Sequence, residues 1–255
     1  MNNTIAIFIK QMQSLLKNPV MLISAVIYVA LVLVITLLMG EDPGIDDCDV
    51  CIPAYICEEH IEAAAPLDTP RPSFAGLFAV MFLGLSMIGS SSALILEDKS
   101  TQNLRFLAMA DVKPKQYMVG TASGLAVMSF SMLILFALVG RYFGEAMLWF
   151  LSVAMSGALV SILLGIMIGM SKYPILATPI SVVFGLGPML STFNENLARI
   201  LRFTYTQQVN LAFSDLHNDL ANLDFSSNFT IIGANGAVFL LIFIWLNRKG
   251  TLVRN

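Results

Sequence analysis

The sequence predicts an all-α integral membrane protein with six transmembrane helices, because its apolar residues are abundant and gather in long runs. Of its 255 residues 57% are hydrophobic and only 12% are charged, which is more apolar surface than a soluble domain can bury. A helix needs about 20 apolar residues to cross the hydrocarbon core of a bilayer. The six expected spans are residues 20–39, 74–96, 118–139, 146–170, 174–193 and 229–246.

The segment before the first run, residues 1–18, predicts an amphipathic helix at the cytoplasmic surface of the membrane. Its apolar side chains recur at helical spacing from Ile5 to Leu16, while Lys10 and Gln11 fall off this stripe, as in helices that lie in the membrane plane. The run that follows is longer than the roughly 7–15-residue core of a signal peptide and lacks a small-residue cleavage site. We therefore expect it to be retained as the first span.

Lysines and arginines predict the orientation of the spans, because cytoplasmic flanks retain positive charge. With the N-terminus placed inside, ten of the 14 basic residues lie in cytoplasmic segments, whereas 14 of the 17 acidic residues lie outside. We therefore expect a multi-pass protein of the plasma membrane with both termini in the cytoplasm. All charged residues fall outside the six runs. This disfavours ion-coupled carriers, because they place ionisable groups within the membrane.

Residues 40–73 are expected to form an extracytoplasmic loop that is acidic and contains all three cysteines. Cys48, Cys51, Cys57 and His60 are residue types that bind zinc in tetrahedral sites. One disulfide among the cysteines is the favoured interpretation, because disulfides persist in oxidising compartments, and an odd cysteine would then remain. Unmodified thiols are the third possibility. The negative charge of the loop serves solubility or attracts a cationic ligand.

Within the runs the polar residues are mainly serine and threonine, and small pairs occur at Gly120/Gly124 and Gly165/Gly169. Small residues at this spacing let helices approach closely. We interpret them as packing positions, with a substrate path as the alternative. The histidines, His60 and His217, fall in expected outer loops, which leaves an intramembrane hydrolase without a catalytic pair.

The cytoplasmic loop at residues 97–117 is too long for a simple turn. We expect a short helix in it, capped at its start by Ser100 or Thr101. Leu104 and Leu107 would lie on the apolar face of that helix. A short amphipathic helix on this side favours a protein partner, and a helix resting on lipid headgroups is the alternative.

The order of these parts resembles the membrane subunit of a type-two ABC exporter. The match rests on Glu97, Thr101, Leu104 and Leu107, which fit the family pattern E-x-x-x-T-x-x-L-x-x-L after the second span; Ser100 stands where the family often has glycine. The resemblance implies that this segment is a coupling helix that docks on a separate ATPase subunit. The residues that it assigns to this contact are Glu97, Asp98, Thr101, Gln102, Leu104, Arg105 and Leu107.

The same resemblance implies the energy source and the assembly. The sequence has no G-x-x-x-x-G-K-[ST] phosphate loop, so ATP and Mg²⁺ would bind the partner ATPase, and we expect this chain to be neither an enzyme nor a holder of cofactors. A second copy or a homologous permease would complete the pathway in the lipid bilayer, and no nucleic acid is expected as a partner. Residues 194–228, between the fifth and sixth spans, would form an extracytoplasmic loop with re-entrant helices.

Residues 1–255 are thus expected to be one transmembrane domain that serves as the permease subunit of an ATP-driven exporter. The substrate would be amphipathic or hydrophobic, such as a peptide, a drug or a lipid-like molecule, because uncharged spans suit entry from the membrane. The alternative is a permease-like immunity or signalling subunit without bulk transport. An intramembrane enzyme ranks last, for want of catalytic residues.

Overall fold

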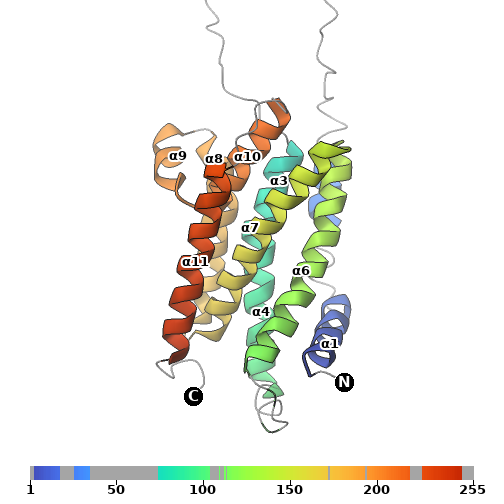
Figure 1. Ribbon diagram of the computed structural model, residues 1–255, viewed down its shortest axis with the longest axis vertical. Helices are drawn as coiled ribbons and strands as arrows, with labels where there is room; N and C mark the ends of the chain where they lie inside the picture. The colour runs from blue at the N-terminus through green and yellow to red at the C-terminus, as the bar shows by residue number, and fades with distance from the viewer. Residues whose placement is uncertain are drawn as a thin grey trace, which may run out of the picture.

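The computed structural model describes residues 3–17, 26–34, 74–103, 109, 112, 114–171, 173–192, 194–218 and 226–248. Within these ranges the chain is helical and contains no strand (Figure 1). The elements, in chain order, are α1 (Asn3–Lys17), α3 (Phe74–Met81), the π-helix η1 (Phe82–Met87), α4 (Ile88–Ser100), α6 (Pro114–Val139), α7 (Glu145–Met170), the 3₁₀ turn η2 (Pro174–Leu176), α8 (Ala177–Ser191), α9 (Glu195–Leu201), α10 (Tyr205–Asn218) and α11 (Ser226–Arg248).

Membrane-length apolar helices are confirmed for five of the six expected spans. In the described part of the chain these are Ala75–Ser100, Gln116–Val139, Glu145–Met170, Pro174–Ser191 and Ser226–Trp245. Of the first expected span, only residues 26–34 are described, and they are helical. The remainder of that span lies outside the described residues. The fold therefore defines a multi-pass helical membrane protein, with five described spans.

The long helices run side by side, and the bundle has two distinct ends (Figure 1). At one end α4 terminates and α6 begins, and α1 lies beside α6 at this end. We call it the Asp98 end, after the residue in the last turn of α4. The opposite end carries α9 and α10, which connect α8 to α11.

Aromatic side chains form much of the core between the helices. Phe82 of η1 packs with its ring centroid 6.2 Å from that of Tyr28 and 5.6 Å from that of Phe136. Towards the other end, Phe150 of α7 stacks on Phe213 of α10 with a centroid separation of 4.4 Å. Such pairs contribute about 0.5–1.5 kcal/mol each beyond the area that they bury.

The glycine pair on α7 lets that helix approach α4 closely, as the packing interpretation expects. A Cβ atom on Gly165 would overlap the Oγ of Ser91, and one on Gly169 would lie 2.8 Å from the carbonyl oxygen of Ser92. Gly120 on α6 has the same role towards α1, since a Cβ there would lie 2.8 Å from Cγ2 of Ile7. These glycines are therefore packing positions, where any larger residue would separate two helices.

The π-helix η1 interrupts the second span at its middle, between α3 and α4. Gly84 of η1 touches α8 so closely that a Cβ atom on it would overlap the backbone of Gly185. Short π-helical segments inside α-helices often occur at functional sites. Nothing in the apolar pattern of residues 74–96 predicts this segment, because the run is hydrophobic on all sides.

Most of helix α10 is buried against its neighbours, with Leu211 and Asp215 exposed. Its residues 205–210 are all buried, and the hydroxyl groups of Tyr205 and Ser161 of α7 form a hydrogen bond of 2.8 Å. This hydrogen bond and the Phe150–Phe213 stack lie 11 residues apart on α7, or about 16 Å, so α10 runs along α7 between them. Re-entry of this segment into the membrane stays a prediction.

Candidate functional site

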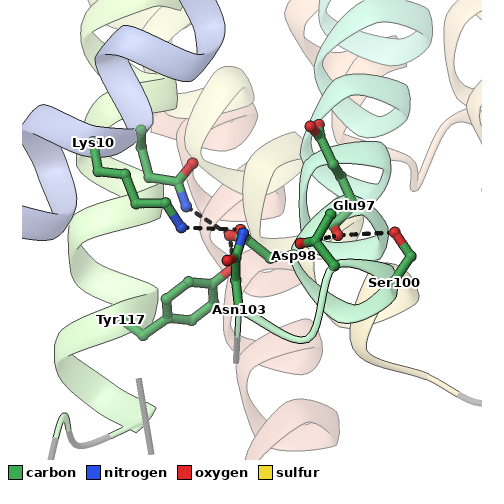
Figure 2. A network of polar contacts seen from close by, with 8 residues as sticks. Lys10, Glu97, Asp98, Ser100, Asn103 and Tyr117 are labelled. Carbon is green, nitrogen blue, oxygen red and sulfur yellow. Dashed lines mark hydrogen bonds and ion pairs between the residues drawn. The ribbon is translucent and has the colours of Figure 1, made fainter. Parts of the chain in front are cut away.

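A buried carboxylate, that of Asp98, lies at the junction of three helices at the Asp98 end (Figure 2). Only 6% of this residue is exposed, and its two oxygens accept four hydrogen bonds. Oδ1 accepts from Lys10 Nζ at 3.2 Å and from Asn103 Nδ2 at 3.0 Å. Oδ2 accepts from Gln11 Nε2 at 2.9 Å and from the Tyr117 hydroxyl at 2.7 Å.

The donors come from separate segments, so the carboxylate joins them. Lys10 and Gln11 belong to α1, Tyr117 lies in the first turn of α6, and Asn103 follows the end of α4. Burial of a carboxylate without a partner costs several kcal/mol. Removal of one partner from a buried ion pair lowers the stability of a protein by a similar amount. Here each oxygen has two donors, and Lys10 adds an ion pair. The position of α1 against α4 and α6 therefore depends on Asp98.

The next residue, Lys99, points to a different helix. Its ammonium nitrogen lies 2.8 Å from the carbonyl oxygens of Gly169 and Met170 and 3.3 Å from that of Ser171. These carbonyls end α7, where backbone oxygens have no partner within their own helix and the helix dipole is negative. Two successive residues thus attach the last turn of α4 to α1 and α6 on one side and to α7 on the other.

Beyond these attachments, the tip of α4 is exposed. Glu97, Ser100, Thr101 and Gln102 are all accessible, and Figure 2 shows the Glu97 side chain directed away from the Asp98 carboxylate. The hydroxyls of Ser100 and Thr101 donate to the carbonyl oxygen of Glu97 at 2.9 and 2.8 Å. Both bonds end on one carbonyl oxygen in the last turn of α4. The residues that an N-cap of the following helix would serve lie outside the described residues, so capping by Ser100 or Thr101 stays a prediction. Gln102, with φ of 56°, turns the chain out of α4.

The seven residues expected to contact an ATPase separate into three groups. Glu97, Thr101 and Gln102 are exposed at the tip of α4, as docking would require. Asp98 is buried, and its carboxylate is occupied by donors from this chain. The others, Leu104, Arg105 and Leu107, lie outside the described residues.

The expected end of the second span at Leu96 is four residues short. The helix continues to Ser100, so Asp98 and Lys99 belong to its last turn and are packed against neighbouring helices. The helix of the second span therefore carries charged side chains in its last turn, beyond the expected run 74–96. A hydropathy pattern ends a span at the first charge, because it contains no information about donors contributed from residues 10 and 11.

Among the described side chains of α1, Ile7 and Gln11 are buried and pack towards α6 and Asp98. In Ile5 and Ile9, which belong to the expected membrane-facing stripe, 50% and 43% of the residue is exposed. Gln11 was expected on the polar side, but its amide donates to the Asp98 carboxylate and is satisfied in the interior. The face of α1 that packs on the bundle therefore combines Ile7 with the polar Gln11.

The candidate zinc and disulfide residues, Cys48, Cys51, Cys57 and His60, lie outside the described residues, as does the acidic loop that contains them. Both interpretations stay predictions. The part of the chain that the structure describes contains no cluster of three or more residues suited to metal binding. The described site is a polar junction built on Asp98 and Lys99.

Comparison of the chain with protein-family models, with curated proteins and with solved structures gave no match. The class of protein consequently rests on the fold itself. Five apolar helices of membrane length define a multi-pass membrane protein. Its distinguishing feature is the junction at the Asp98 end, where one helix end is attached to three other helices.

Proposed function

We propose that this chain is the membrane subunit of an ATP-driven exporter of the type-two ABC kind, which works with a separate ATPase subunit. The observation that carries the proposal is the construction of the end of α4. Its tip is exposed at Glu97, Thr101 and Gln102. The turn directly beneath it is attached to α1, α6 and α7 through Asp98 and Lys99.

A docking element that transmits force needs both properties. If the tip were exposed but loosely attached, movement of a partner would rotate the tip and leave the spans in place. With Asp98 and Lys99 in position, displacement of the tip has to move α1, α6 and α7 or break several charge-assisted hydrogen bonds. Such bonds are roughly twice as strong as neutral ones. The arrangement therefore suits a segment through which a partner acts on the bundle.

Docking of an ATPase on the tip of α4 implies an orientation of the bundle in the membrane. The Asp98 end would face the cytoplasm, where an ATPase has access to ATP. Apart from residues at their ends, the five described spans carry no charged side chain, which favours an amphipathic or hydrophobic substrate moving along or from the membrane. A second membrane subunit, identical or homologous, would complete the pathway at the plasma membrane.

Site-specific photo-crosslinking in native membranes tests the proposal. A photo-reactive amino acid at Gln102 should form an adduct with a protein that contains a phosphate-loop ATPase domain, identified by mass spectrometry. The same group at Val127, which is exposed on α6, is the matched control and should react with lipid instead. An adduct pattern at Gln102 without any ATPase, in membranes where the protein is folded, would count against the proposal.

Functional coupling is tested on the purified complex in lipid. Glu97→Ala and Leu104→Asp should lower ATP turnover or release the ATPase, because both change the expected docking segment. Unchanged assembly and turnover in both variants would contradict the assignment. ATP turnover with no export of candidate peptides or drugs would instead favour the signalling or immunity subunit.

A further inference from the structure

We propose that Lys99 is the positioning residue that makes α7 follow the end of α4, so that displacement at the Asp98 end reaches α10 at the opposite end. The inference rests on the proposed function only for the source of the displacement, which is the ATPase. Lys99 is not among the residues that the family resemblance assigns to the partner contact. Its role comes from its three backbone acceptors.

The acceptors of Lys99 make a firm attachment. An ammonium group has three N–H donors, and Lys99 Nζ has three carbonyl oxygens within 3.3 Å, those of Gly169, Met170 and Ser171. Backbone oxygens at a helix end cannot rotate away as a carboxylate side chain can. The partial negative charge of the helix terminus adds to the attraction. Lys99 therefore attaches to the end of α7 itself rather than to a mobile side chain.

The rest of the contact between α4 and α7 makes this attachment important. Gly165 and Gly169 bring α7 against Ser91 and Ser92 of α4. Small residues allow close approach, but they provide few large side chains that would resist sliding along the helix axis. Lys99 supplies a charge-assisted attachment at the end of the same contact, which sets the axial position of α7 relative to α4.

Helix α7 connects this attachment to the other end of the bundle. Ser161 hydrogen-bonds Tyr205 of α10 at 2.8 Å, and further along α7 a Cβ on Gly157 would lie 2.9 Å from Val209. From Met170 to Ser161 is nine residues, or about 14 Å of helix. An axial shift of α7 would therefore act directly on the buried face of α10.

The attachment can be tested without an ATPase. Spin labels at Gln102 and Tyr173, both exposed, report the distance between the tip of α4 and the segment after α7 in protein reconstituted in lipid nanodiscs. We expect a narrow distance distribution in the wild type and in Lys99→Arg, and a broader or shifted one in Lys99→Met. Ser131→Ala, which removes a hydroxyl bonded only within α6, is the control. An unchanged distribution in Lys99→Met overturns the proposal.

Transmission is tested on the complex with the ATPase that is captured at Gln102. Labels at Leu211 of α10 and Leu138 of α6, both exposed, should change their distance when a non-hydrolysable ATP analogue binds. The change should persist in Lys99→Arg and be lost in Lys99→Met, which still assembles with the ATPase. An equal change in Lys99→Met overturns the role of Lys99 and leaves the proposed function intact. A wild type that forms no ATPase complex overturns the proposed function, and the nanodisc measurement still decides whether Lys99 fixes α7 to α4.

Discussion

Substitution of Asp98 provides a quantitative test of the junction at the end of α4. In Asp98→Ala the four donors lose their acceptor. Gln11 and Tyr117 are only 2% and 4% exposed, so neither can turn to water, and each unpaired donor costs about 1–3 kcal/mol. Lys10 and Asn103 are more accessible and can be solvated. We therefore expect Asp98→Ala to lower the free energy of unfolding by about 3 kcal/mol.

Asp98→Asn should destabilise the protein less than Asp98→Ala, because two of the four donors can accept a hydrogen bond instead. An asparagine that keeps its oxygen towards Lys10 and Asn103 places its amide nitrogen towards Gln11 and Tyr117. The Gln11 amide can flip to present its oxygen, and the Tyr117 hydroxyl can accept as well as donate. The hydrogen bonds are then retained and only the charge is lost, so we expect a loss of about 1 kcal/mol.

Reversible unfolding in mixed detergent micelles, followed by tryptophan fluorescence, measures these differences. Tyr117→Phe in both backgrounds completes a double-mutant cycle. It should destabilise the wild type by about 1–2 kcal/mol and Asp98→Ala by less, because in that variant the hydroxyl has already lost its carboxylate acceptor. Equal stability of Asp98→Ala and wild type, or an equal effect of Tyr117→Phe in both backgrounds, would refute the reasoning.

Three further predictions concern other parts of the bundle. Arg141 follows α6 with φ of 54°, so Arg141→Gly should stabilise the protein by about 1 kcal/mol in the same unfolding assay; a similar gain in Arg141→Ala would contradict this cause. Gly165→Ala should separate α7 from α4 and lower the thermal unfolding temperature, whereas Gly233→Ala, with open space around it, should not; equal effects would disprove the packing role. Tyr205→Phe should lower the free energy of unfolding by about 1 kcal/mol, because it removes the hydrogen bond to Ser161. Adding Ser161→Ala to that variant should lower it little further. Additive losses of stability in the double variant would argue against the hydrogen bond.

The spans could be predicted from the sequence because membrane burial leaves a local signal. A run such as 146–170 is apolar over its whole length, and the structure has α7 at Glu145–Met170. The glycine pair on α7 was likewise predictable as a packing feature, since small residues at a spacing of four lie on one face of a helix. Which helix the pair contacts was not predictable, because that depends on the arrangement of the bundle.

The junction at Asp98 could not be derived from the sequence, because its donors are far away along the chain. Gln11 is 87 residues from Asp98, and the acceptors of Lys99 are 70 to 72 residues away. A charge pair next to an apolar run ordinarily indicates a loop, so the pattern places residues 97–99 in the cytoplasmic loop. The signal available was indirect. Asp98 and Lys99 continue the helical register of the second span, and Gln11 follows the apolar Ile7 by four residues, so the two share one face of the helix.

The π-helix η1 has a consequence for how the second span presents its two halves. Each residue of an α-helix advances the side-chain direction by about 100°, and a π-helical turn contains an extra residue. The residues of α3 and those of α4 therefore do not continue one another's faces. With this offset, the first half of the span contacts α8 and α10, and the second half contacts α7. The extra residue within Phe82–Met87 therefore changes which side chains of the second half face α7, without changing any residue of the junction at Asp98.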